Sequence, residues 1–144
     1  MWGYHSEKMY TGEEKIVIAF DIGTNTSIAS YTHLVGGSLP IVQALHMYPE
    51  SLRDQSLNLP TLPRGVSLLR IYKHFLLYMF KHTQSHFQSK IPNGSAIWNR
   101  LRSNMEFVFA IPINWDYTQQ QIMCQAAIDA GLFRHTRQRH CFIS

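Results

Sequence analysis

The residues best suited to chemistry form one short run, Asp21-Ile22-Gly23-Thr24-Asn25-Thr26-Ser27. Gly23 lets the backbone approach a ligand closely, and a turn after it can direct successive N–H groups at one anion, an arrangement that suits phosphate oxygens. The hydroxyls of Thr24 and Thr26 add side-chain donors. The Asp21 carboxylate can hold Mg²⁺ through water. The run therefore predicts a phosphate-binding turn beside a carboxylate that orders a metal ion.

A plain hairpin turn is the alternative for the same run, because Asp, Asn, Ser and Thr side chains also satisfy the backbone of their own turns. These residues alone leave both interpretations open. A second candidate site, His135 with His140 and Cys141, could suggest a metal, but its spacing fits no standard set and a fourth ligand is not evident.

The elements that position this run follow from the hydrophobic pattern. Residues 16–20 are apolar and β-branched, which predicts a strand buried on both faces of a sheet and ending at Asp21. Further strands are expected over 27–34 and 39–46, joined by a glycine-containing turn. The proline-containing stretch 48–64 is expected to be a long loop.

The pattern then changes from the period of strands to the period of helices. Apolar residues at spacings of three and four predict a helix over 66–87, and a shorter helix follows over 95–102. Residues 105–111 predict a strand, and a last helix extends to about residue 130. The expected caps are Ser67, the capping box of Asp116 with Gln119, and Gly131. The order β-β-β-α-α-β-α predicts an α/β fold with a mixed sheet covered by helices.

Composition places the chain among single globular domains, because apolar residues make up 45% and charged residues only 15% of its 144 positions. The net charge of +4 is modest, and the one dense basic stretch, 134–140, is expected to be a terminal tail, so we expect no nucleic acid partner. Arg70, Lys73 and His74 interrupt the longest apolar helix, which argues against a membrane span. Two cysteines outside a CxxC pair and an N-terminus without an apolar stretch favour a cytoplasmic location.

Two stretches carry a resemblance to a known family. Residues 15–34, KIVIAFDIGTNTSIASYTHL, resemble the first phosphate hairpin of the actin, hexokinase and seventy-kilodalton heat-shock protein superfamily, whose chaperone branch typically reads FDIGTTYSGVSY. Residues 107–132, FVFAIPINWDYTQQQIMCQAAIDAGL, resemble the strand, turn and helix ending in AGL of the same chaperones. The segments between them are most similar to a divergent branch that is abundant in fungi.

The resemblance implies a partial actin-like ATPase domain of the ribonuclease H-like kind, with the first lobe only. It implies that residues 15–132 form this domain. Residues 1–14 are polar and aperiodic and are expected to be a loose, disordered leader, and residues 133–144, where the resemblance ends, are expected to be a basic tail. The chain would then be an N-terminal fragment of the chaperone pattern.

The resemblance also implies roles for individual residues. Asp21 would be the catalytic residue, ordering Mg²⁺ and the attacking water, with the metal held through water. Gly23, Thr24, Asn25 and Thr26 would approach the β- and γ-phosphates of ATP or ADP. Asn25 stands where the chaperones usually have Thr, and Thr26 where they usually have Tyr. The backbone N–H groups can donate to the phosphates whichever side chain is present. We therefore expect these two differences to affect the positioning of the phosphates more than their binding.

Other parts of the family pattern have no counterpart here. We find no match for the segment with the catalytic lysine, the second phosphate motif or the adenosine motif. Lys73 and Lys81 fall on the predicted helix 66–87 and are interpreted as solvated or snorkelling charges. Because nucleotide in this family lies between two lobes, we expect one lobe alone to bind it weakly and to hydrolyse it poorly or not at all.

Two functions remain open at this point. The first is an ATP-binding and ATP-hydrolysing chaperone-like domain, with Mg²⁺ as cofactor and with nucleotide, protein clients or co-chaperones as partners. The alternative is a non-catalytic remnant or protein-interaction module that uses an exposed sheet edge. A sugar or acetate kinase of the same superfamily is disfavoured, because residues 107–132 resemble the chaperones.

Overall fold

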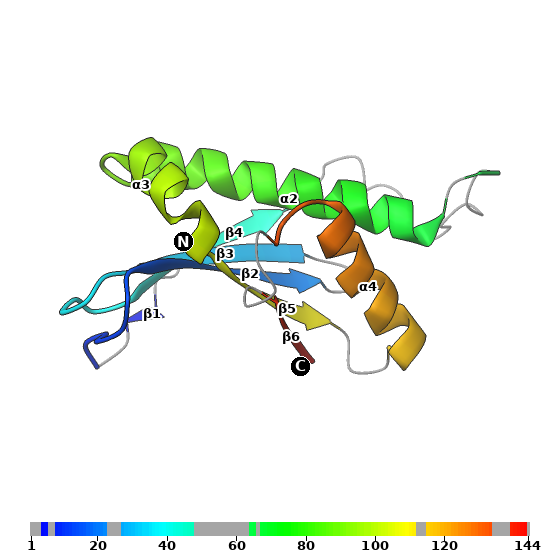
Figure 1. Ribbon diagram of the computed structural model, residues 1–144, viewed down its shortest axis with the longest axis horizontal. Helices are drawn as coiled ribbons and strands as arrows, with labels where there is room; N and C mark the ends of the chain where they lie inside the picture. The colour runs from blue at the N-terminus through cyan, green and yellow to red at the C-terminus, as the bar shows by residue number, and fades with distance from the viewer. Residues whose placement is uncertain are drawn as a thin grey trace.

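The computed structural model describes residues 4–5, 8–22, 27–47, 64–65, 67–111, 115–133 and 139–143. These residues form one mixed sheet with helices packed against one of its faces (Figure 1). The α/β class and the order β-β-β-α-α-β-α expected from the sequence are confirmed. Two short strands, one near each end of the chain, are additional to that order.

The sheet has the strand order β1-β4-β3-β2-β5-β6. Its strands are β1 Tyr4–His5, β2 Lys15–Ile22, β3 Ser27–Leu34, β4 Ile41–Met47, β5 Glu106–Ile111 and β6 Arg139–Ile143. Strands β2, β3 and β4 form an antiparallel meander, whereas β5 pairs in parallel with both β2 and β6. Strand β2 therefore lies at the boundary between the antiparallel and the parallel parts of the sheet.

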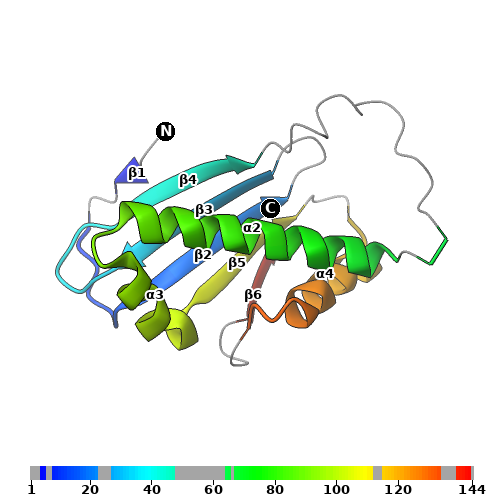
Figure 2. The ribbon, with the colours of Figure 1, turned by 90° about the horizontal axis from the view of Figure 1, so that it is seen from above.

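The helices are α2 Leu68–Lys90, α3 Gly94–Leu101, the short 3₁₀ helix η1 Arg102–Asn104, and α4 Tyr117–Asp129. Seen from above, α2 crosses the strands along the length of the molecule, and α3 and α4 lie on the same side of the sheet (Figure 2). None of the described helices has an apolar stretch long enough to cross a bilayer.

The predicted caps are present at the helix ends. Ser67 Oγ accepts a hydrogen bond from the Arg70 backbone N–H at 3.2 Å, and Asp116 forms the reciprocal capping box with Gln119. At the other end of α4, Gly131 has a φ of +74°, which a residue with a Cβ atom adopts only with strain. The Leu132 N–H then bonds to the Ala127 carbonyl, which closes a Schellman motif. The AGL ending is thus a helix stop whose leucine is fully buried.

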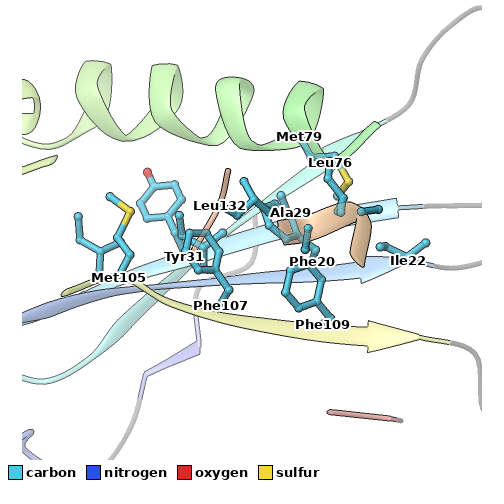
Figure 3. Close-up of a cluster of buried hydrophobic side chains, with 14 of the residues drawn as sticks. Phe20, Ile22, Ala29, Tyr31, Leu76, Met79, Met105, Phe107, Phe109 and Leu132 are labelled. Atoms are coloured by element: carbon cyan, nitrogen blue, oxygen red, sulfur yellow. The ribbon is translucent and has the colours of Figure 1, made fainter. Parts of the chain in front are cut away.

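The core lies between the helices and the sheet (Figure 3). Alternate residues of β2 and β5 point into it, and the Phe20 ring lies 5.6 Å from Phe109 and 6.4 Å from Phe107, centroid to centroid. From the helix side, Leu76 and Met79 are fully buried. Aromatic pairs at these separations add to the stabilisation that burial itself provides.

Burial of β2 differs from the expectation of a strand covered on both sides. Ile16, Ile18, Phe20 and Ile22 are buried, but the intervening residues are half-buried or exposed. All the described helices pack on one face, so the other face of the sheet carries no helix among the described residues. Val17 and Ala19 point to that face and are half-buried. Because they are apolar, residues 16–20 form a continuous apolar run, which is why burial on both faces was expected.

A short strand of the sheet lies near each end of the chain, one within residues 1–14 and one within 133–144. Near the N-terminus, β1 pairs with β4, and Tyr10 exchanges backbone hydrogen bonds with the turn at Gly37 and Ser38. Within the segment expected to be a basic tail, β6 pairs with β5. The limits of the domain itself stay a prediction.

The crossing from α2 to α3 depends on Gly94. A Cβ atom at this position would lie 2.8 Å from both Gln88 Cα and the Phe87 carbonyl oxygen. Both are backbone atoms, which cannot move aside as a flexible side chain can. We expect Gly94→Ala to lower the free energy of unfolding by about 1–3 kcal/mol, as overpacking does elsewhere. Urea denaturation measures this, with the exposed neighbour Ser95→Ala as control; equal losses in the two variants would contradict the close packing.

Candidate functional site

Asp21 lies inside strand β2 rather than in the turn after it. It pairs with Ile28 of β3 on one side and with Ala110 of β5 on the other. The sequence places the end of this strand at Asp21-Ile22-Gly23, and β2 ends there, at Ile22. Strand β3 pairs with it as far as Ile22 and β5 as far as Asp21. Asp21 is exposed, whereas Phe20 and Ile22 on either side of it are buried.

The proposed phosphate contacts follow immediately after this strand. Gly23, Thr24, Asn25 and Thr26 lie outside the described residues, so their roles stay a prediction. The two residues that bracket them, Ile22 and Ser27, are partners in the antiparallel register. The β2–β3 hairpin expected from the sequence is confirmed by this pairing.

The end of β2 lies at the edge of the sheet where ligands commonly bind in α/β folds. Strands β2 and β5 are parallel, so their carboxyl ends share one edge, and α2 begins at that end of the molecule (Figures 1 and 2). Side chains alternate along a strand, so Asp21 projects on the same side as Val17 and Ala19. Its carboxylate thus lies on the face opposite the helices.

The Asp21 carboxylate is available to a ligand. Within the described ranges, no ion pair or hydrogen bond engages it. Nor do three or more His, Cys, Asp or Glu side chains gather anywhere in those ranges to form a metal site. A single carboxylate still fits Mg²⁺, which takes one or two carboxylates from a protein and completes its shell with water and the phosphates of its substrate.

The lysines of α2 do not share this position. Lys73 lines a surface depression of about 390 Å³ together with Ser67, Leu69, Arg70, His74 and Asp129. The lining residues belong to α2 and its N-cap and to α4, and both helices lie on the same side of the sheet (Figure 2). Lys73 is thus placed across the sheet from Asp21, in agreement with its interpretation as a charge outside the phosphate site.

A second polar cluster lies at the opposite end of β2. Arg100 of α3 donates to both carboxylate oxygens of Glu14 at 2.8 Å and 2.9 Å, and His33 Nε2 lies 2.9 Å from one of them. Sequence reasoning missed this cluster, because Glu14 and Arg100 are 86 positions apart and form no local motif. We assign it a structural role, since it ties the start of β2 to α3 and β3.

The cluster gives stability a defined pH dependence. The hydrogen bonds from Arg100, followed by the one with His33, lower the pKa of the Glu14 carboxyl from 4.5 to about 2. A carboxyl whose pKa is lowered by folding stabilises the fold above its unfolded pKa, and this contribution is lost as the pH falls from 4.5 toward 2.

We therefore expect Glu14→Gln to lose on the order of 1 kcal/mol of unfolding free energy near neutral pH, as partly exposed networks do. Its deficit relative to the unaltered chain should shrink as the pH falls below about 4.5. Urea denaturation at a series of pH values measures both. Glu13→Gln is the matched control, because the Glu13 carboxylate accepts a hydrogen bond from the neutral Asn104 side chain at 3.2 Å and forms no ion pair with the described residues. A deficit that stays constant down to low pH would contradict the assignment.

Comparisons with known proteins add little to this geometry. No protein-family model matches the sequence, and no curated protein matches it. Among solved structures, the chain is similar to the Aquifex aeolicus PPX-GPPA enzyme, with a TM-score of 0.37 and 10% sequence identity over 92% of this chain. The similarity spans only 36% of that enzyme. At this TM-score the likeness carries no weight for function, and nothing in it singles out the heat-shock chaperones.

Proposed function

We propose that this chain binds the phosphates of a nucleotide, ATP or ADP with Mg²⁺, at the carboxyl edge of β2. The observation that carries the proposal is the exposed Asp21 carboxylate, which no described residue engages and which lies one residue before the end of β2, the first strand of the β2–β3 hairpin. In this proposal Gly23, Thr24, Asn25 and Thr26 supply backbone and hydroxyl donors to the phosphates. Asp21 orders the hydrated metal.

Hydrolysis is a more demanding function than binding. Phosphoryl transfer is accelerated by positioning and by charges aimed at the transferred group. The described residues place one carboxylate and no lysine or arginine at this edge on the side of Asp21. We therefore propose nucleotide binding as the principal property of the chain, with chaperone-like ATP hydrolysis as the function of the family that its sequence resembles.

A protein-interaction module is the second candidate, and the uncovered face of the sheet favours it. Val17 and Ala19 of β2 and Val108 and Ala110 of β5 are half-buried on that face, without a described helix over them. Parallel strands are usually covered on both sides. Apolar side chains in this position favour a further layer of protein.

Titration with a fluorescent ATP analogue tests the nucleotide proposal. We expect saturable binding that requires Mg²⁺, and we expect Asp21→Asn to weaken it about tenfold, the effect of losing one charge-assisted contact. Gly23→Val should weaken it with or without the metal, because the branched side chain blocks close approach of the backbone.

Asp116→Asn is the matched control, since it removes the same charge from an exposed position and Asn also caps helices. The proposal fails if no saturable binding appears at millimolar nucleotide. It also fails if Asp21→Asn and Asp116→Asn bind alike.

A further inference from the structure

Charge is distributed unevenly between the helices and the rest of the chain. Residues 67–105, which contain α2, α3 and η1, include six Lys or Arg and three His but no Asp or Glu. All nine acidic residues of the chain lie elsewhere in the sequence. The long helix α2 alone contains four of the six cations. The charged side chains on the outer surface of α2 are therefore all basic.

Three of the four cations of α2 lie along one side of the helix. Arg70, Lys73 and Lys81 follow the helical period and project away from the side that buries Leu76 and Met79. Arg70 and Lys81 are exposed and Lys73 is partly exposed. The same side of α2 also carries four exposed polar or aromatic residues, His74, Tyr78, His82 and Ser85. We call this set of seven residues the basic stripe.

The acids among the described residues do not neutralise the three cations of the basic stripe. Elsewhere in the described residues, Lys15 is paired with Glu106 at 2.7 Å and Arg100 with Glu14. No such ion pair engages Arg70, Lys73 or Lys81 in the described part of the chain. Unpaired charges of one sign on a straight helix produce a positive potential along its length.

One acid borders the basic stripe. Asp129 at the end of α4 lines the depression of about 390 Å³ that Arg70 and Lys73 also line. Asp129 Oδ1 accepts a hydrogen bond from Gln125 at 2.8 Å and forms no ion pair with these cations. Its charge therefore opposes an incoming anion at this end of the stripe.

We propose that the basic stripe binds the sugar-phosphate backbone of a nucleic acid. Such binding needs cations and hydroxyl, amide or imidazole donors along a line, and the stripe offers these. The exposed Tyr78 ring, 4.3 Å from the His82 ring, adds an aromatic surface against which a base or sugar can pack. The partner is thus a polyanion recognised through its phosphates, without base specificity.

Two other polyanionic partners fit the surface less well. An anionic membrane requires an apolar side to insert, but the apolar side of α2 is used in the core, which leaves Ile71 at 38% and Tyr78 at 42% exposure. An acidic protein would normally bury an apolar centre within the interface, and these two residues are too few to form one. A phosphate backbone needs neither.

The inference runs against the sequence expectation that no nucleic acid is bound. The sequence contains one contiguous basic stretch, 134–140, and this stretch was interpreted as a terminal tail. Cations that are separated in the sequence were not considered as a group. In a helix, residues 70, 73 and 81 lie on one side although they are separated in the sequence. The inference is independent of the phosphate turn at Asp21, so Asp21→Asn should leave this binding unchanged.

Fluorescence anisotropy with a labelled mixed-sequence DNA duplex of about 20 base pairs tests the proposal. Three phosphate contacts predict a slope of log K against log salt of about −2.7, so binding should weaken about fortyfold between 50 and 200 mM NaCl. Lys73→Gln with Lys81→Gln should reduce the magnitude of that slope by about 2. Asp129→Asn should tighten binding.

Arg134→Gln with Arg137→Gln is the matched control, because it removes the same charge from the basic stretch near the C-terminus. Circular dichroism and thermal melts of each variant verify that the fold is unchanged. The proposal is overturned if no saturable binding appears at about 50 mM salt, a concentration at which phosphate contacts are strong. It is also overturned if the control pair, rather than the α2 pair, reduces the slope. In a competition experiment, displacement of the DNA by polyglutamate or anionic vesicles with the same efficiency as by unlabelled duplex would overturn it too.

Discussion

The parallel pairing of β2 with β5 is the constraint on which the rest of the structure depends. It places Val17 opposite Glu106, although most of the described chain lies between them. Parallel strands cannot be joined by a tight turn, so the intervening chain must return across a face of the sheet. Helices α2 and α3 make this crossing, and their apolar side meets Phe20 and Phe107 in the core. The same pairing brings the carboxyl ends of two strands to one edge, beside Asp21.

Because the described helices cover one face only, the molecule has two surfaces of different chemistry. The uncovered face carries half-buried apolar residues and ends in the Asp21 carboxylate. The helix face carries Arg70, Lys73 and Lys81 of α2, which form no ion pair with the residues that the structure describes. Asp21 projects on the face of the sheet opposite the helices, so both the sheet and a helix about 10 Å in diameter lie between it and the outer side of α2. Charges further apart than the screening length in physiological salt, about 8 Å, interact little. An anion bound on α2 and a nucleotide bound at Asp21 would therefore influence each other little.

Local signals predicted the elements well, and pairings distant in the sequence were not predictable from it. Strand 27–34 has the bounds that its pattern indicated, and the capping box at Asp116 and the stop at Gly131 are present, because each depends on neighbours within a few residues. The pattern places Asp21 at the end of its strand, where it lies in the structure. The pairing of Asp21 with Ile28 of β3 and Ala110 of β5 was not predictable, because the register of these ladders is a property of the whole sheet. The contact of Glu14 with Arg100 is of the same kind.

The two candidate binding sites differ in how far the sequence can reveal them. A phosphate turn uses successive backbone N–H groups, so its residues are contiguous and their types are restricted by backbone geometry. A surface that binds a polyanion requires only that cations share one side of an element and lack partners. The sequence shows the spacing of Arg70, Lys73 and Lys81, but that spacing is also typical of a solvated helix face. Only the fold shows that Glu106 and Glu14 pair with Lys15 and Arg100, and that no described acid forms an ion pair with the three cations of the basic stripe. This distinguishes a charged surface from a neutralised one.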